Sequence, residues 1–402
     1  MRFGLIRDPV LWVLVVLGCI FGFTALDWGT PNRERSLLVF GDVDRIRELS
    51  DRMVQARREL YAWTEDSDVD RPSATRIAEK PPTESFSPTA EAPAEEISIG
   101  MLNSLRSYLL RSSDPDEQQT LSGLANMNPL EGDFDPNEYR YGGCYYYTLA
   151  AVLGTAMVTG LAQLRPGVEA YFLQPETLST VFTFCRLLGA LSAVLGGIIL
   201  YLWSSRRWGR DIGAAATLFL YASPLVITYN RISKPNVYSM FLALIGLILW
   251  DRVLKGIEDD TKRPRRLAVL SGVAFGLSVG SFVVSGIVLI LGLLWALLRL
   301  QLNRRLFLGT LPYTAAGIVA GFVLTNPYVF LSWENFSDLY LEHASGSGWA
   351  YGVPQVAKLW TLVKDLPFAF GYIATVGLII GFIVAIVEKN LFSVSCLVCF
   401  LL

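Results

Sequence analysis

The chain has little charge and almost no histidine, and these absences exclude several classes of protein. Charged residues make up 17% of the 402 residues, the formal net charge is −2, and His343 is the only histidine. Binding to nucleic acid requires a basic surface. We therefore expect no nucleic-acid partner.

Metal and nucleotide motifs are also missing. No G-x-x-x-x-G-K-[ST] loop and no H-E-x-x-H pair occurs. The cysteines lie in or beside apolar runs without zinc or disulfide spacing, and we interpret them as small buried hydrophobic residues. They are Cys19, Cys144, Cys185, Cys396 and Cys399. No cofactor is firmly implied, the metal content stays unknown, and a divalent cation stays an open alternative.

Long apolar runs are what the chain has in abundance. Hydrophobic residues make up 52% of it and the mean hydropathy is +0.41. Runs of about 17–23 residues are long enough to cross a bilayer as helices. We therefore predict an all-α polytopic membrane protein, with one transmembrane domain over residues 1–402. The runs lie at 9–26, 181–203, 211–229, 236–250, 267–282, 284–298, 307–325, 366–388 and 391–402.

The first and last runs each allow two interpretations. Run 9–26 follows Arg2 and Arg7 as a secretory signal would, but it exceeds the usual 7–15-residue core and no A-x-A-like site follows. We interpret it as an uncleaved anchor. Run 391–402 ends the sequence without a polar flank. Either the last helix is short, or the sequence is a fragment of a longer protein.

Basic residues occur in every second connection between the runs. They are Arg206, Arg207 and Arg210, then the segment 255–266, then Arg304 and Arg305, and finally Lys389. The positive-inside rule makes these connections cytoplasmic. Residues 27–180, 229–235 and about 326–360 are then external and are expected to face one another.

The apolar run 144–163 would reverse this pattern if it crossed the membrane. We therefore predict a juxtamembrane helix, whose three tyrosines at 145–147 suit a membrane interface. An ordinary span is the alternative. Within the same external loop, about 62–125 is rich in Pro, Ser, Thr and Glu, which predicts a mobile, disordered insertion. A short amphipathic helix is expected inside it at 97–111.

Two carboxylates stand at the start of the long external loop. Asp27 follows the first run, and Glu34 follows a Gly-Thr-Pro turn that can fold both groups back over the membrane surface. Partial desolvation there would raise the pKa of a carboxylate toward that of a general base. A solvated helix end, with Asp27 as an interfacial cap, is the alternative.

A second acidic and aromatic cluster precedes the juxtamembrane helix. It contains Asp133, Asp135, Glu138, Tyr139 and Tyr141, followed by Gly142 and Gly143. Glycines allow close approach of the backbone to a ligand. An acidic loop with aromatic membrane anchors is the structural alternative.

Three cations on the external side are candidates for binding a phosphate. Arg186 lies about one turn inside the external end of a span, where an unpaired charge is costly. Arg231 and Lys234 lie on a short external turn, against the positive-inside rule, and Arg can bind a phosphate through two hydrogen bonds. Snorkelling to the interface is the alternative for Arg186.

The segment 326–352 combines aromatic residues at helical spacing with acidic residues and His343, and then becomes rich in Gly and Ser. This pattern predicts an amphipathic helix on the external surface. A lone histidine usually has a structural role, and contact with a phosphate is the functional alternative.

The ordered set of these features resembles the GT-C glycosyltransferases, in particular the protein O-mannosyltransferase and lipid A aminoarabinose transferase-like branch. The resemblance rests on P-x-x-E at 31–34, N-P…F-D-P…Y-R-Y-G-G…Y at 128–147, and Arg186 opening a span. S-P-L-V-I-T-Y-N-R-I-S-K-P-N at 223–236 and L-T-N-P-Y at 324–328 complete it.

The resemblance implies a GT-C-type helix bundle with a long first external loop. It implies a membrane glycosyltransferase that takes a sugar from a polyprenyl-phosphate donor and transfers it, with inversion, to an acceptor hydroxyl outside the cytoplasm, in the plasma or inner membrane. The acceptor, whether protein, lipid or glycan, is unknown. The implied roles are a base for Glu34 or Asp27, phosphate binding for Arg186, Arg231, Lys234 and His343, and a donor or acceptor loop with Asp135, Glu138 and Tyr141.

Two departures keep alternatives open. Many relatives have Asp-Glu where this chain has Arg33-Glu34, and Asp where it has Asn236. Metal binding and an inactive relative that acts in assembly therefore stay open. A secondary transporter or lipid carrier is the alternative from another class, although transporters place charges near the bilayer midplane within broken helices.

Overall fold

The computed structural model describes residues 8–65, 97–258, 264–286 and 304–340, together with isolated positions between 288 and 383. Among these residues the regular elements are helices, and the only pairing of the β type is a single bridge between Asn128 and Asp133. The chain divides into two compact units. The first contains Met1–Leu26, Gln119–Val152 and Cys185–Leu402, and the second contains Asp27–Gln118 and Leu153–Phe184.

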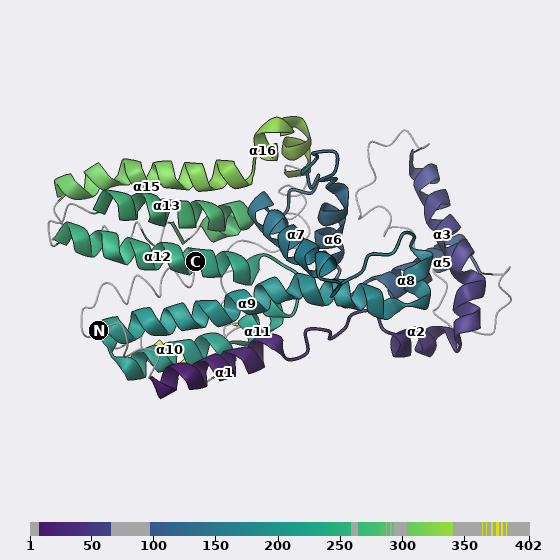
Figure 1. Cartoon of the computed structure of the whole chain (residues 1–402), viewed down its shortest axis with the longest axis horizontal. Helices are drawn as coiled ribbons and strands as arrows, with labels where there is room; N and C mark the ends of the chain where they lie inside the picture. The colour runs from purple at the N-terminus through teal and green to yellow at the C-terminus, as the bar shows by residue number, and fades with distance from the viewer. Residues whose placement is uncertain are drawn as a thin grey trace. The chain divides into compact units, whose positions relative to one another are not determined.

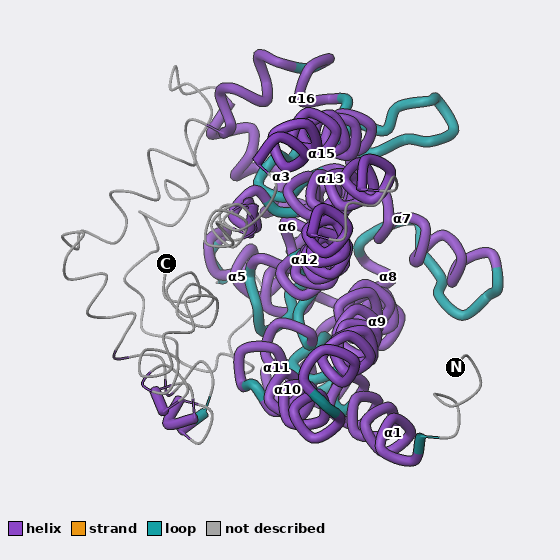
Figure 2. Tube along the Cα trace, turned by 90° about the vertical axis from the view of Figure 1, so that its left-hand side faces the viewer, coloured by secondary structure: helices purple, strands orange, loops and turns teal. Residues whose placement is uncertain are grey.

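The first unit is built from long apolar helices that run side by side (Figure 1). Seen nearly end-on, they follow one another in the order α15, α13, α12, α9, α10 and α1 (Figure 2). Their bounds are α1 Pro9–Phe23, α9 Pro175–Trp208, α10 Arg210–Ala222, α11 Pro224–Asn230, α12 Asn236–Glu258, α13 Pro264–Ser281 and α15 Arg304–Thr325.

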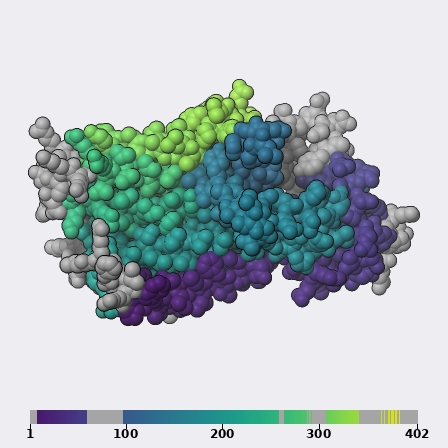
Figure 3. Space-filling view, viewed as in Figure 1, coloured from purple at the N-terminus to yellow at the C-terminus, as the bar shows by residue number. Residues whose placement is uncertain are grey.

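The first apolar run forms α1, which begins where the side chain of Asp8 accepts a hydrogen bond from the backbone of Val10 and Pro9 occupies the first turn. The helix ends at Phe23, three residues before the end of the predicted run. Trp12, Val16 and Ile20 are each more than half exposed. In the space-filling view α1 forms a strip along one edge (Figure 3). This apolar surface suits lipid.

Several helices meet the length and composition of a membrane span. They are Pro175–Trp208, Asn236–Ile257 and Phe307–Thr325. The predicted run 211–229 is divided into α10 and α11, which are bent by 56°. Pro224 explains the break, because proline disfavours helical backbone in the preceding Ser223 and suits the first turn of a new helix. The fold is that of an all-α polytopic membrane protein, as predicted.

Glycines bring α13 and α15 into close contact. A Cβ atom at Gly276 would overlap the carbonyl oxygen of Ile318, and one at Gly321 would lie 2.6 Å from the carbonyl oxygen of Val273. Such small residues every fourth position let helix backbones approach within a membrane. Gly276-Leu-Ser-Val-Gly280 also has the letters G-x-S-x-G, but it lies inside α13, so it packs helices and forms no nucleophile elbow.

Ion pairs join the helix ends that the basic residues predict to be cytoplasmic. Arg210 pairs with Asp8, which also accepts a hydrogen bond from Tyr201. Arg207 lies 3.5 Å from Asp251. The start of α1, the end of α9 and the last turns of α12 therefore meet at one end of the first unit.

The second unit has its own core. Its helices pack Leu49, Met53, Leu102, Leu105 and Phe172 together. The helices are α2 Arg33–Phe40, α3 Val43–Glu65, α5 Ile99–Leu110 and α8 Glu169–Leu173. The helix predicted at 97–111 is confirmed by α5.

Part of the segment that we predicted to be a mobile insertion is helical. We predicted a mobile segment over 62–125, but α3 continues to Glu65, and α5 and α6 (Asp116–Asn126) occupy much of the second half. Apolar residues at helical spacing, such as Leu102, Leu105 and Leu109, are buried. Their burial explains why this part of the segment forms a helix. Residues 66–96 lie outside the described part.

The helix predicted at 144–163 is α7, Gly143–Val158, followed by turns. Its tyrosines correct the sequence interpretation, because Tyr145 and Tyr146 are 1% and 0% exposed inside the protein and do not anchor it at an interface. Two shorter elements lie near the ends of α13 and α15. They are the 3₁₀ helix η2, Val283–Gly286, and α16, Tyr328–Leu331.

Candidate active site

The turn that carries Arg231 and Lys234, residues 230–236, is held by two other elements of the first unit. The carbonyl of Ser233 accepts a hydrogen bond of 2.8 Å from the hydroxyl of Thr120 on α6. The hydroxyl of Ser233 lies 3.0 Å from that of Tyr145 on α7. These contacts bring together two segments that were predicted to be external. We call residues 230–236 the cationic turn.

The two cations of this turn differ in their surroundings. Arg231 follows α11 and is half-buried, and its buried Nε atom has no hydrogen-bond partner among the described residues. The Nζ atom of Lys234 lies 5.8 Å from the centre of the Tyr229 ring, within range of a cation–π interaction. A buried N–H group without an acceptor is costly, so the guanidinium of Arg231 is suited to an anionic ligand.

Arg186 on α9 is only 1% exposed, the largest side chain of the described residues to be so fully buried. Its Nη1 atom donates a hydrogen bond of 2.7 Å to the carbonyl of Leu26, just beyond α1. The snorkelling alternative is therefore wrong, since the side chain is enclosed by protein. A guanidinium keeps its charge when it is buried, so Arg186 makes its surroundings more favourable for an anion.

Gly142 and Gly143, at the start of α7, lie close to the ends of two neighbouring helices, α13 and α15. The backbone N–H of Gly142 donates to the carbonyl of Ser281 at 3.0 Å, and that of Gly143 donates to the side chain of Asn326 at 2.7 Å. A Cβ atom at Gly142 would overlap the carbonyl of Gly280. The expectation that these glycines contact a ligand is not what the structure shows, because helix ends already occupy the space.

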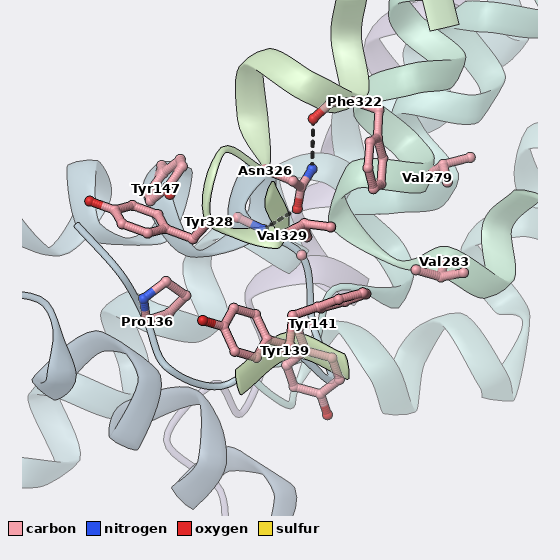
Figure 4. Close-up of a pocket in the computed structure, with 13 residues that line it drawn as sticks. Pro136, Tyr139, Tyr141, Tyr147, Val279, Val283, Phe322, Asn326, Tyr328 and Val329 are labelled. Atoms are coloured by element: carbon pink, nitrogen blue, oxygen red, sulfur yellow. Dashed lines mark hydrogen bonds between the residues drawn. The ribbon is translucent and has the colours of Figure 1, made fainter. Parts of the chain in front are cut away.

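A small pocket of about 50 Å³ lies beside this pair. Its walls are largely aromatic, and Figure 4 shows Tyr139, Tyr141, Tyr147 and Tyr328 around it. Asn326 also lines the pocket, but its side chain is committed to Gly143, Phe322 and Thr325. The pocket therefore offers flat apolar surfaces, which suit stacking against a ring or an aliphatic chain.

Asp135 links the acidic loop to the segment after α15. Both of its carboxylate oxygens lie 3.0 Å from the hydroxyl of Tyr139, and one accepts a hydrogen bond of 2.8 Å from Ser332. Burial, followed by the hydrogen bond to Asp135, raises the pKa of Tyr139 above its usual value. The hydroxyl thus stays a donor at neutral pH.

Glu138 and Tyr141, which were assigned to the same loop as Asp135, have partners close to them in the chain. Glu138 is half-buried and lies 3.6 Å from the Nε atom of Arg140. Tyr141 makes an edge-to-face contact with Tyr145, with ring centres 6.0 Å apart. Tyr145, which belongs to the cluster 128–147, also contacts Ser233, so this cluster and the cationic turn lie next to each other.

The candidate bases belong to the second unit. Asp27 and Glu34 are both exposed in the structure. The carbonyl of Asp27 accepts hydrogen bonds from Thr30, and Glu34 lies in the first turn of α2, which Asn32 caps. Protein side chains therefore do not bury either carboxylate. Since α1 ends at Phe23, Asp27 does not cap it.

The remaining candidates are not described. His343 lies outside the described residues, as do Cys396 and Cys399. Cys144 and Cys185 are buried and free of disulfides, as interpreted, and Cys19 is half-buried. Within the described ranges no group of three or more His, Cys, Asp or Glu side chains could hold a metal ion.

Sequence reasoning missed Asn230, Ser233 and Asn326. Each is at most 5% exposed. Asn326 belongs to the quoted motif L-T-N-P-Y, and Asn230 and Ser233 flank the cations of the quoted segment 223–236. Their polarity next to helix ends was the available signal, but burial is visible only in the folded chain.

The fold of the described residues defines a class, an all-α polytopic membrane protein. The comparison with protein families is more specific. Residues 178–333 match the dolichyl-phosphate-mannose-protein mannosyltransferase family, which lies in the GT-C superfamily. This match confirms the resemblance over that segment and supports a membrane glycosyltransferase of the GT-C type. No curated protein and no solved structure gave a match.

Proposed function

We propose that the chain transfers a sugar from a polyprenyl-phosphate donor to an acceptor hydroxyl on the non-cytoplasmic side of the membrane, with inversion at the sugar. The observation that carries the proposal is the cationic turn, where the buried Nε atom of Arg231 has no acceptor in the part of the chain that the structure describes. The turn lies within residues 178–333, the segment similar to the dolichyl-phosphate-mannose-protein mannosyltransferase family. Arg186 lies in the same segment.

The proposed chemistry is a single displacement. The acceptor hydroxyl oxygen forms a bond to the anomeric carbon, the bond from that carbon to the phosphate oxygen breaks, and the electron pair leaves with the phosphate. Glu34, or Asp27 in its place, takes the hydroxyl proton. Their exposure in the structure suits groups that must meet an acceptor arriving from water.

The cations supply the other half of the reaction. A departing phosphate needs its charge stabilised more than it needs a proton, and fixed cations do this at no reorganisation cost. Arg186, Arg231 and Lys234 take this role, with His343 as a further contact. Asp135, Glu138 and Tyr141 belong to the loop beside the donor or acceptor.

The transporter alternative has less support. Its expected feature is a broken helix that carries ionisable groups. The α10–α11 pair is broken at Ser223, but no Asp, Glu, Lys or Arg lies between Asp211 and Arg231. The charges instead lie at the two ends of the pair, and Arg231 is at the end that is predicted to be external, where a lipid-linked donor could meet it.

The test measures incorporation of a labelled sugar from a polyprenyl-phosphate donor in membranes that contain the wild type, Glu34→Gln or Asp27→Asn. Loss of a general base lowers the rate by about 10²–10⁴-fold, so at least one variant should show this loss. Glu48→Gln is the control, because Glu48 is an exposed acid on α3 that pairs only locally with Arg45. Normal transfer by both Glu34→Gln and Asp27→Asn would refute the assigned base. No transfer by the wild type would refute the donor.

A further inference from the structure

The cationic turn is flanked by buried polar atoms that lack partners. Asn230 is 1% exposed, and its Oδ1 atom has no hydrogen-bond partner among the described residues. The Nε atom of Arg231, the next residue, is also buried without one. Buried polar groups in proteins are nearly always hydrogen-bonded, so adjacent exceptions require an explanation, and a missing ligand is one.

A third such atom lies on α7. The hydroxyl of Tyr146 is buried and unpartnered, and its residue is 0% exposed. The ring of Tyr146 packs against Gly123 on α6, where a Cβ atom would lie 2.6 Å from it. Thr120, one turn earlier on the same face of α6, holds the carbonyl of Ser233. The three unpartnered atoms therefore all belong to elements that meet at the cationic turn.

Asn230 also lies against the helix that carries Arg186. A Cβ atom at Gly189 would be 3.5 Å from the Cα and carbonyl oxygen of Asn230. Gly189 follows Arg186 by three residues on α9, so both lie on one face of that helix. The backbone of Asn230 therefore packs against the face of α9 that carries Arg186, and Arg231 follows Asn230 in the chain.

The chemistry of the unpartnered atoms identifies the ligand group that would satisfy them. Nε of Arg231 is a donor and needs an acceptor, which a phosphate oxygen supplies. Oδ1 of Asn230 is an acceptor and needs a donor, which an ionised phosphate lacks and a hydroxyl has. A phosphate joined to a hydroxyl-bearing ring, a glycosyl phosphate, offers both groups side by side.

We propose that Asn230 is a further donor-binding residue, which accepts a hydrogen bond from a sugar hydroxyl while Arg231 binds the adjoining phosphate. This inference rests on the proposed polyprenyl-phosphate sugar donor. It assigns Asn230 as a residue that contacts the sugar of that donor. It also gives the buried Oδ1 atom of Asn230 a hydrogen-bond donor that the described residues do not supply.

The experiment measures binding of two lipids to the purified full chain in nanodiscs, polyprenyl phosphate and polyprenyl-phosphate mannose. Asn230→Leu should bind the first as the wild type does and the second about tenfold more weakly, the order of effect of one lost neutral hydrogen bond. Arg231→Gln should weaken binding of both. Equal affinity of Asn230→Leu and the wild type for the mannosylated lipid would overturn the role of Asn230 and leave the donor proposal standing. Failure of the wild type to bind either lipid would overturn both.

Thermal unfolding separates binding from a structural role. Asn230→Leu removes a side-chain amide whose Oδ1 atom has no hydrogen bond among the described residues. The unfolding midpoint of this variant should therefore equal or exceed that of the wild type. Asn326→Leu is the matched control, since Asn326 is also buried but makes hydrogen bonds to Gly143, Phe322 and Thr325. It should lower the midpoint. A loss of stability in Asn230→Leu as large as in Asn326→Leu would assign Asn230 a structural role and refute the proposal.

Discussion

At the scale of single residues, burial decides which candidates can act on an anion. Arg186 and Arg231 looked alike in sequence, each a cation near an external helix end. In the structure Arg186 is enclosed and hydrogen-bonded to Leu26, whereas the Nε atom of Arg231 finds no acceptor among the residues described. The first suits a fixed positive charge, and the second suits direct contact with a ligand.

Replacement of Arg186 tests that fixed charge. Arg186→Met should lower sugar transfer by at least about 100-fold, the cost of removing one preorganised group that stabilises developing charge. Because methionine fills similar volume without a charge to bury, the unfolding midpoint should stay close to that of the wild type. Transfer and thermal unfolding are measured on the same preparation. Arg206→Gln, at the opposite end of α9, is the control, and full activity of the Arg186→Met variant would contradict the role.

Replacement of Tyr139 tests the contact with Asp135. Tyr139→Phe removes a hydroxyl that contacts both carboxylate oxygens, so we expect a loss of about 1–3 kcal/mol in the free energy of unfolding. Denaturant titration measures it. Tyr340→Phe is the control, because Tyr340 is 39% exposed. Equal stability of both variants would show that the contact between Tyr139 and Asp135 contributes nothing.

At the scale of elements, the contact between α13 and α15 depends on glycine. Gly276→Ala places a Cβ atom on the carbonyl of Ile318, and such overpacking costs about 1–3 kcal/mol. Gly309→Ala is the matched control on α15, because no atom lies within 4 Å of the position a Cβ would take. Thermal unfolding in detergent should therefore rank Gly276→Ala below the wild type and Gly309→Ala at or above it. The reverse order would mean that the two helices do not pack as described.

At the scale of the whole molecule, the predicted topology assigns each connection between helices to the external or the cytoplasmic side of the membrane. In a cysteine-free background, Arg165→Cys should react with a membrane-impermeant maleimide from outside, since Arg165 is exposed in the predicted external loop. Arg266→Cys, exposed at the start of α13, should react only after the membrane is opened. Labelling of position 165 from the cytoplasm would reverse the topology and place α7 across the membrane.

How much the sequence predicts can be judged from particular elements. Apolar runs located α1, α9, α12 and α15, because the length of a hydrophobic run is a local property of the sequence. The break at Ser223 was not predicted, although Pro224 is visible, because proline can kink a membrane helix or end it. The sequence analysis predicted disorder for most of the segment that forms α5 and α6. Its composition is polar overall, and composition alone does not show that a few leucines are buried.

The sequence alone determined that this chain is a membrane protein of helices, and it selected the cations and carboxylates that could carry glycosyl transfer, because hydropathy and charge are properties of residues. Only the tertiary structure decided that Tyr145 and Tyr146 are buried, that the glycine pair contacts helix ends, and that side-chain atoms of Asn230 and Arg231 lack partners. Those facts depend on which distant segments pack together. Ser233 of the cationic turn contacts Thr120 on α6 and Tyr145 on α7, which precede it by 113 and 88 residues.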